Sequence, residues 1–221
     1  MFSCNYVTVT DISGNEFLEA IPKGSASQHA LYEQSFPISE KIPCDVIKNK
    51  IERGIFQLWI QKDQEKIILM AILCPLPQTE FTLLGYLATS PEYRGKGMGK
   101  YFMIFIKEQL QKNNQWLLLE VENPLFPPEK ELKQRRVNFY LRLGAKIIKD
   151  VPYLLPKLSE RESPEMILMV YPDYKKDHLN PFLLEKLIVL VYQYFYDQIK
   201  HKNIPHLIKK IPQTIELSDT F

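Results

Sequence analysis

The amino-acid sequence predicts an α/β fold (α+β in some classifications): a mixed, mostly antiparallel sheet with helices on both faces. One reason is the order of patterns after residue 27, which runs two helices, three strands, helix, strand, helix and two strands. Another is an apolar strand that leads through a glycine-rich loop into an amphipathic helix between residues 83 and 100. We expect N-terminal strands over 1–26, a core domain over 27–173, and a hydrophobic helix and tail over 174–221.

The composition is that of an ordinary globular protein. Of the 221 residues, 45% are hydrophobic and 24% are charged, and the formal net charge is +2. These values are typical of globular domains. Nucleic-acid binding calls for a clustered basic footprint, whereas here acidic residues are interleaved with the basic ones around 129–150. We therefore expect no nucleic-acid partner.

Cysteine and histidine show no metal-binding pattern. Cys4, Cys44 and Cys74 are widely spaced, which favours free thiols over a disulfide framework or a zinc site. The histidines lack the helical spacing of a zinc ligand pair, so we expect no metal. The N-terminus has neither a basic start nor a long apolar stretch. No secretory signal is evident, and we expect a cytoplasmic location.

The first half of the chain contains weak strand patterns, two helical patterns and a hairpin pattern. Residues 17–21 fit either a strand or a short helix. Proline and glycine mark the ends of the two predicted helices. The predicted ranges are strand 6–10, strand or short helix 17–21, helix 27–36, helix 44–53, strand 55–60 and strand 66–73.

The second half alternates more clearly between strand and helix. Gly85 lies inside the first of these strands, and a glycine in a strand often marks a bulge or a close approach of the backbone. A segment with three prolines, 151–164, is predicted to be a long loop. The other predicted ranges are strand 81–89, a helix that ends near 112, strand 116–122, helix 129–143, strand 146–148 and strand 166–170.

The glycine-rich loop is the strongest functional signal. Unpaired N–H groups and the positive end of a helix bind phosphate oxygens, and small residues let the backbone close on the anion. The spacing fits neither a P-loop nor the dinucleotide fingerprint. An ordinary solvated loop is the alternative. The loop carries three glycines and three cations, namely Gly95, Gly97, Gly99, Arg94, Lys96 and Lys100.

The pattern Arg94-x-x-Gly97-x-Gly99, after a strand that ends Leu87-Ala88-Thr89, resembles the acetyl-CoA pyrophosphate loop of the GNAT acetyltransferase superfamily. The order of elements extends this resemblance over residues 27–172. It implies a sheet splayed at its centre, where backbone groups pair with the pantetheine arm of acetyl-CoA. The cofactor-binding residues it implies are Leu87, Thr89, Arg94, Gly95, Lys96, Gly97, Met98, Gly99 and Lys100.

A second motif, Tyr140-x-x-x-Gly144, is similar to the family's helix ending, in which a tyrosine lies near the thioester sulfur. The resemblance implies that Tyr140 is a general acid that protonates the departing thiolate. Ala145 and Lys133 stand where the family commonly has an aromatic residue and an asparagine. The alternative is an ordinary half-buried tyrosine.

The general base does not follow from the resemblance, because Leu83 stands where some members carry a glutamate. Glu120 and Glu122 lie two apart on a predicted strand and therefore share one face. Glu122, nearer the open end of the strand, is our candidate base, and Glu120 is the weaker one. A solvated carboxylate at a strand end is the alternative for both.

The C-terminal region extends beyond a minimal domain of this family. Asn180-Pro181 begins a helix that is apolar nearly all round and must be buried. Charged residues interrupt it too early for a membrane span. It packs on its own domain, covers the acceptor site, or forms a homodimer through 181–199. Residues 204–221 are predicted to be a loosely attached arm.

The resemblance implies an N-acetyltransferase that moves an acetyl group from acetyl-CoA to a primary amine of a small molecule or peptide. Transfer would be direct, within a ternary complex. The alternatives are a longer-chain N-acyltransferase, whose pocket the proline-rich loops and apolar tail would enlarge, and a non-catalytic acyl-CoA-binding or interaction module.

Overall fold

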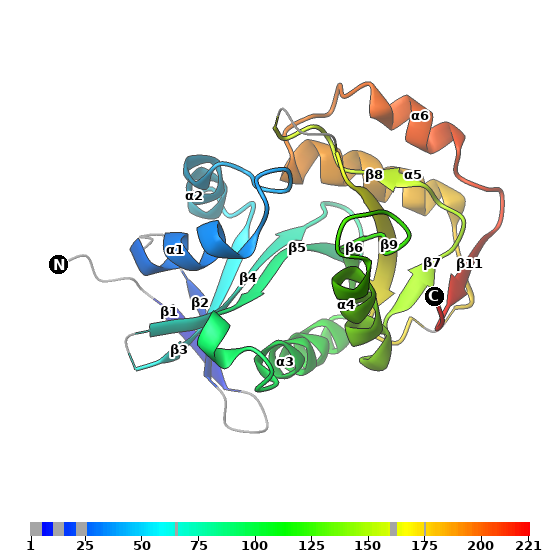
Figure 1. Cartoon of the computed structure of the whole chain (residues 1–221). Helices are drawn as coiled ribbons and strands as arrows, with labels where there is room; N and C mark the ends of the chain where they lie inside the picture. The colour runs from blue at the N-terminus through cyan, green and yellow to red at the C-terminus, as the bar shows by residue number, and fades with distance from the viewer. Residues whose placement is uncertain (1–5, 11–15, 21–25, 65, 160–162, 175) are drawn as a thin grey trace.

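The computed structural model describes residues 6–10, 16–20, 26–64, 66–159, 163–174 and 176–221. Within these ranges the strands form an 11-stranded mixed sheet in the order β1-β2-β3-β4-β5-β6-β9-β7-β11-β10, with β8 paired to β9. Neighbouring strands are antiparallel except β5 and β6, which are parallel. Figure 1 shows the helices arranged around this sheet. The predicted fold class is confirmed.

The element bounds agree with the predicted ranges to within a few residues, and 17–21 belongs to a strand. The strands are β1 (Tyr6–Thr10), β2 (Glu16–Ala20), β3 (Gln57–Asp63), β4 (Lys66–Pro75), β5 (Phe81–Thr89), β6 (Trp116–Glu122), β7 (Lys146–Ile148), β8 (Tyr153–Leu154), β9 (Glu165–Tyr171), β10 (His178–Leu179) and β11 (Ile215–Ser218). The helices are α1 (Ala26–Ser35), α2 (Cys44–Glu52), the 3-10 turn η1 (Pro91–Tyr93), α3 (Met98–Lys112), α4 (Lys130–Arg142), α5 (Pro181–Leu190), the π-helical η2 (Val191–Phe195) and α6 (Asn203–Lys209).

Two hydrophobic clusters cover the two faces of the sheet. On one face α3 and α4 pack against alternate residues of β3 to β6, β7 and β9. On the other face α1, α2, α5, η2 and α6 pack against the intervening residues. The helical spacing of Phe102, Met103, Phe105, Ile106 and Leu110 produces the buried face of α3. This two-sided arrangement places the ends of β5 and β6 between helices from both halves of the chain.

The C-terminal region is part of the sheet and the core, and the predicted loosely attached arm is wrong. Strand β11 pairs with β7 and with β10. Ile204, Leu207 and Ile215 are buried. The sequence pattern of this arm is too short to indicate burial, because a two-turn helix and a four-residue strand show little periodicity.

The apolar C-terminal helix packs on its own sheet. It ends earlier than 199, because the α-helix stops at Leu190 and the π-helical turn ends at Phe195. Leu184, Leu187 and Ile188 have no exposed surface, so their burial needs no second chain. Within the described ranges, every helix is too short or too polar to cross a bilayer.

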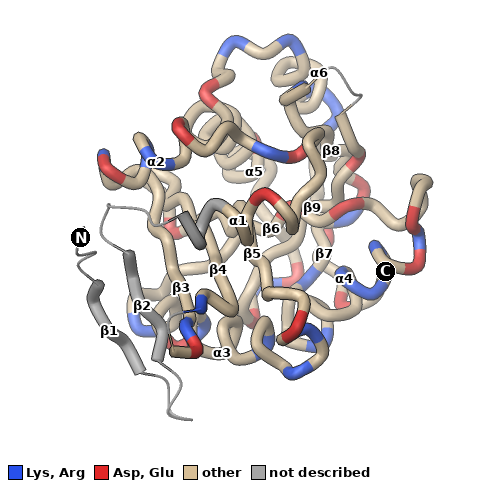
Figure 2. The backbone as a smooth tube through the Cα atoms, turned by 60° about the vertical axis from the view of Figure 1, so that its left-hand side comes forward, with Lys and Arg blue, Asp and Glu red and all other residues tan. Residues whose placement is uncertain are grey.

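Charge is mixed along the chain. Figure 2 shows basic and acidic positions following one another along the tube in that view. On α4 the cations form ion pairs with nearby acids, as in the Arg135–Glu131 pair at 3.6 Å. The helix therefore presents both signs of charge. The predicted long loop at 151–164 contains β8, which pairs with β9 and lies close to the site described below.

Candidate active site

Strands β5 and β6 separate halfway along their length. They pair in parallel only from Phe81 with Trp116 to Leu84 with Leu119. The register between β4 and β5 shifts after Ile72, so that Gly85 is an extra residue and forms a bulge. The bulge turns the rest of β5 away from β6. The splayed sheet that the resemblance implied is therefore present, and Gly85 lies where it begins.

The end of β5 directs backbone groups into this opening. The N–H of Ser90 donates to the carbonyl of Ile68 on β4, at 2.8 Å. Backbone groups alternate in direction along a strand, so those of Leu87 and Thr89 point away from β4 and toward the opening. Neither residue pairs with β6. These are the two residues that the sequence analysis assigned to the pantetheine arm.

The glycine-rich loop begins helix α3. Gly97 is the N-cap residue with φ +84°, a left-handed conformation that favours glycine, and no side chain caps this helix end. The first N–H groups of a helix have no partner within it, and here Tyr101 is the first whose N–H returns to the Gly97 carbonyl. The N–H groups of Met98, Gly99 and Lys100 therefore remain available to an anion.

The cations of the loop lie around this helix end. Arg94 is exposed, and its Nε donates to the Thr89 carbonyl at 3.3 Å, which ties the loop to the end of β5. The Nζ of Lys96 lies 4.5 Å from the centre of the Tyr93 ring, a cation–π distance. Lys100 is exposed on the first turn of α3. Positive side chains and open amides thus occur at one end of the opening.

A cavity of about 460 Å³ occupies the opening between β5 and β6. It brings together the end of β5, Arg94, both candidate bases and Tyr140. The loop between α1 and α2 and the C-terminal region close its other sides. Its lining comprises Gln34, Ser35, Phe36, Pro37, Glu40, Leu84, Gly85, Tyr86, Leu87, Ala88, Thr89, Arg94, Glu120, Val121, Glu122, Leu132, Arg136, Tyr140, Leu155, Met166 and Tyr196.

Glu120 is a half-buried carboxylate held by two tyrosines. The Tyr153 hydroxyl donates to Oε1, and the Tyr196 hydroxyl donates to Oε2 at 2.8 Å. Burial raises the pKa of Glu120 to about 7, although both hydroxyls lower it. A carboxyl group with such a pKa accepts and releases protons near neutral pH, which a general base requires.

Glu122 is differently placed. It forms ion pairs with Arg136 and, at 3.6 Å, with the Nζ of Lys133. Lys133 is itself buried and also donates to the Phe126 carbonyl at 3.1 Å. Both carboxylate oxygens of Glu122 are therefore already engaged by cations. The geometry therefore reverses the order of the two candidates and favours Glu120.

Tyr140 reaches the cavity from the opposite face of the sheet. It lies on α4 and packs with the α3 and α4 cluster, while Glu120 points toward the face covered by α1 and α5. Burial raises the pKa of Tyr140 to about 12, and the nearby Arg136 lowers it. The phenol is therefore protonated at neutral pH and can donate a proton. Ala145, the departure from the family's motif, is buried.

Comparisons with known proteins fit this geometry. Residues 54–144 match the family model of the acetyltransferase (GNAT) domain. A solved structure of a GNAT-family protein from Bacteroides thetaiotaomicron has a TM-score of 0.60 and 27% identity, over 76% of this chain and 89% of that chain. Residues 54–144 of this chain are thus a GNAT acetyltransferase domain. The match to this domain supports an acyltransferase enzyme.

Two further solved structures share the GNAT fold at lower identity. The ribosomal-protein-S18-alanine N-acetyltransferase from Escherichia coli gives a TM-score of 0.50 and 17% identity, over 72% of this chain and 96% of that chain. The smu.2055 protein from Streptococcus mutans UA159 gives a TM-score of 0.51 and 16% identity, over 66% of this chain and 90% of that chain. At these identities the likeness shows the fold alone. No curated protein matches the chain.

Part of the cavity lies outside the matched GNAT range. Met166 and Tyr196, which line the cavity, follow residue 144, as does Tyr153, which donates to Glu120. Nothing in the sequence pattern singled out the two tyrosines. Tyr196 reads as one more aromatic residue of an apolar helix, and Tyr153 as part of a loop. Only the pairing of β8 with β9 and the packing of η2 bring their hydroxyls to Glu120.

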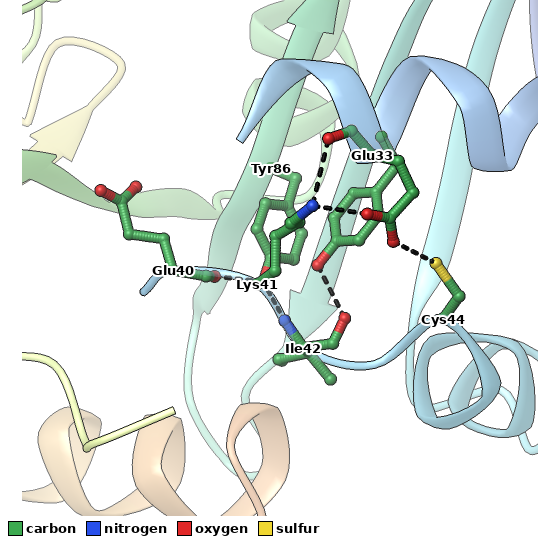
Figure 3. A network of polar contacts seen from close by, with 7 residues as sticks. Glu33, Glu40, Lys41, Ile42, Cys44 and Tyr86 are labelled. Atoms are coloured by element: carbon green, nitrogen blue, oxygen red, sulfur yellow. Dashed lines mark hydrogen bonds and ion pairs between the residues drawn. The ribbon is translucent and has the colours of Figure 1, made fainter. Parts of the chain in front are cut away.

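Glu40 is a further residue that lines the cavity and that no motif in the sequence indicated. The Tyr86 hydroxyl donates to the Glu40 carbonyl at 2.7 Å and accepts from the Ile42 N–H at 3.0 Å, which fastens the loop after α1 to β5. Figure 3 shows this network, with the Glu40 carboxylate extending away from it. Burial, followed by repulsion from Glu122, raises the pKa of Glu40 to about 7. No motif surrounds Glu40 in the sequence.

Proposed function

We propose that this protein is an N-acetyltransferase that moves an acetyl group from acetyl-CoA to a primary amine of a small molecule or peptide. The observation that carries the proposal is the cavity between β5 and β6. Arg94, from the loop that begins α3, lines it together with a carboxyl group with a pKa near 7 and a protonated phenol.

The glycine-rich loop is suited to the donor's diphosphate. Open amides of the first turn of α3 and the cations Arg94, Lys96 and Lys100 supply hydrogen bonds and positive charge. Backbone groups of Leu87 and Thr89 then extend a strand-like pairing to the pantetheine arm. Bound in this way, acetyl-CoA supplies an electrophilic thioester carbonyl. This places the thioester beside Glu120 and Tyr140.

The proposed reaction proceeds directly, without an acyl-enzyme. Glu120 removes a proton from the acceptor ammonium, and the neutral nitrogen attacks the carbonyl carbon. Backbone N–H groups at the end of β5 stabilise the tetrahedral oxyanion. The carbon–sulfur bond then breaks, Tyr140 gives its proton to the departing thiolate, and the extra proton of the acetylated nitrogen passes to the Tyr140 oxygen. Glu120 releases the first proton to solvent, and the products are an N-acetyl amine and CoA.

Two features support an amine acceptor. Glu40 and Glu120 both border the cavity with raised pKa values, so a bound cation would stabilise their charged forms. Lys133 and Arg136, the cations that act on Glu40, are already paired with Glu122. A cavity of about 460 Å³ also leaves the longer-chain acyl donor as an alternative, which the assay below distinguishes.

An amine-dependent CoA-release assay tests this function. We expect release of CoA from acetyl-CoA to require an amine from a panel of small amines and peptides, with faster turnover on acetyl-CoA than on longer acyl-CoA donors. Binding of acetyl-CoA without turnover on any acceptor would favour a non-catalytic module.

Arg94→Glu should raise the KM for acetyl-CoA about tenfold, because one phosphate contact is lost. An unchanged KM would remove the loop's proposed role.

Tyr140→Phe tests the general acid. The substitution removes a hydroxyl and keeps the ring, which packs 5.0 Å from the ring of Phe139. We expect kcat to fall about 10²-fold, the lower end of the contribution of general acid catalysis. The dissociation constant of CoA, measured by calorimetry, should change less than twofold. Equal turnover in the variant would exclude Tyr140 from proton transfer.

A further inference from the structure

A short segment of the C-terminal region, residues 194–197, is fastened to α2 by a buried lysine. Lys50 is 3% exposed, and its Nζ donates to the carbonyls of Tyr194 at 2.6 Å and Phe195 at 2.9 Å. The same Nζ forms an ion pair with Asp197 at 2.9 Å. A buried ammonium is costly unless it is fully paired. The position of segment 194–197 is therefore specified by the charge of Lys50.

The same segment packs on the bulge that opens the sheet. Phe195 is 1% exposed, and its ring lies over Gly85, where an added Cβ would be 2.2 Å from ring carbons. Its ring also lies 5.0 Å from Phe56 and 5.6 Å from Tyr86. The glycine thus serves two purposes, because it makes the bulge and leaves room for Phe195.

Tyr196 is the residue that these two contacts orient. It follows Phe195 directly, and its hydroxyl donates to Oε2 of Glu120 at 2.8 Å, opposite the Tyr153 hydroxyl on Oε1. A carboxylate that receives a hydrogen bond on each oxygen is fixed in orientation and stabilised in its charged form. Both donors lie outside the matched acetyltransferase range.

We propose that segment 194–197 is a positioning element of the active site, in which Lys50 fixes the backbone and Tyr196 orients the Glu120 carboxylate toward the acceptor amine. The inference rests on the proposed role of Glu120 as the base. Lys50 and Tyr196 act through Glu120 and are positioning residues. The C-terminal region is thus part of the catalytic arrangement and more than a cover for the sheet.

The groups that face Glu120 determine whether its pKa rises or falls when Tyr196 is changed. The tyrosine hydroxyls lower its pKa, while burial raises it. Loss of either hydroxyl should therefore raise the pKa of Glu120 further. The titratable groups that interact with Glu120 from the surrounding elements are Glu40 after α1, Cys74 on β4, Tyr86 on β5, Tyr153 on β8, and Tyr192 and Tyr196 on the C-terminal region.

Tyr196→Phe tests the proposal, with Tyr171→Phe as the matched control. Tyr171 is also buried, but its hydroxyl donates to the Met103 carbonyl at 2.7 Å, on the other face of the sheet. The pKa of Glu120 is read from carbon-13 NMR titration of labelled glutamate carboxyl groups, with Glu120→Gln to assign the signal. We expect an upward shift of about one unit in Tyr196→Phe and no shift in Tyr171→Phe.

Kinetics give the second measurement. In Tyr196→Phe the rise of kcat/KM with pH should shift to higher pH by the same amount, about one unit. Activity should then fall about tenfold below pH 7 and less above pH 8. Lys50→Met should shift this rise in the same direction. An unshifted Glu120 signal in Tyr196→Phe would overturn the proposal. If the protein transfers no acyl group, the NMR titration still decides whether Tyr196 positions Glu120, so the two failures are distinguishable.

Discussion

Glu120→Gln should lower kcat at pH 8 by at least about 10²-fold, the contribution typical of a general base, while the KM for acetyl-CoA stays nearly constant. The amide oxygen can accept from one tyrosine hydroxyl and the amide NH2 can donate to the other, so the side chain keeps its shape and both contacts. It cannot accept a proton from the acceptor. The wild-type kcat/KM should rise with pH through about 7, the pKa of Glu120, and the variant should lack this limb.

Glu120→Gln should lower activity but raise the free energy of unfolding above pH 7. Because burial raises the pKa of Glu120 to about 7, the folded state binds a proton that the unfolded state releases near its ordinary carboxyl pKa. Stability is then greatest below that ordinary pKa and falls as the pH rises through 7. Ionised Glu120 costs on the order of 3 kcal/mol at pH 8. The Gln variant should lose the part of the pH dependence that Glu120 contributes, while the part due to Glu40 remains, as measured by urea unfolding at pH 5 and pH 8.

Two matched variants distinguish the contribution of Glu120 to activity from those of Glu40 and Glu122. Glu40→Gln removes the other carboxyl group with a pKa near 7, so a pH limb that persists in this variant belongs to Glu120. Glu122→Gln should reduce the free energy of unfolding, because Lys133 and Arg136 lose their partner. Its kcat should change less than that of Glu120→Gln. A larger kcat loss in Glu122→Gln would restore Glu122 as the base.

Gly85→Ala should reduce the free energy of unfolding by about 2–3 kcal/mol, in the range of overpacking substitutions. The added Cβ would lie 2.2 Å from carbons of the Phe195 ring. The ring cannot move easily, because Phe56, Tyr86 and Tyr196 pack around it. A displaced Phe195 would carry Tyr196 away from Glu120, so activity should fall as well. Urea unfolding followed by circular dichroism measures the loss.

Gly54→Ala is the control for a glycine with open space. Its Cβ would meet no atom within 4 Å, although the residue has φ +69°. The cost should be only that of the left-handed backbone, about 1 kcal/mol. Adding Phe195→Leu to Gly85→Ala should recover part of the lost stability, with a coupling of about 1 kcal/mol or more. Additive effects in this cycle would show that the two residues do not compete for the same space.

Local pattern was sufficient for most of the fold. The run 81–89, the glycine-rich loop and the helix to 112 show strong periodicity and clear end signals, and the structure has β5, η1 and α3 there. The C-terminal arm was the exception. Its burial depends on pairing between β11 and β7, some 70 residues apart in the chain, and no local signal encodes such a pairing.

For the candidate site, the sequence alone indicated the loop, the bulge glycine, Tyr140 and the pair of glutamates, because each belongs to a short motif or to one face of one strand. It did not determine which glutamate is suited to be the base. That depends on the environment of each carboxylate: Arg136 and Lys133 surround Glu122, while burial and two distant tyrosines surround Glu120. A pKa is set by solvent exclusion and neighbouring charge in three dimensions, and only the tertiary structure decides both.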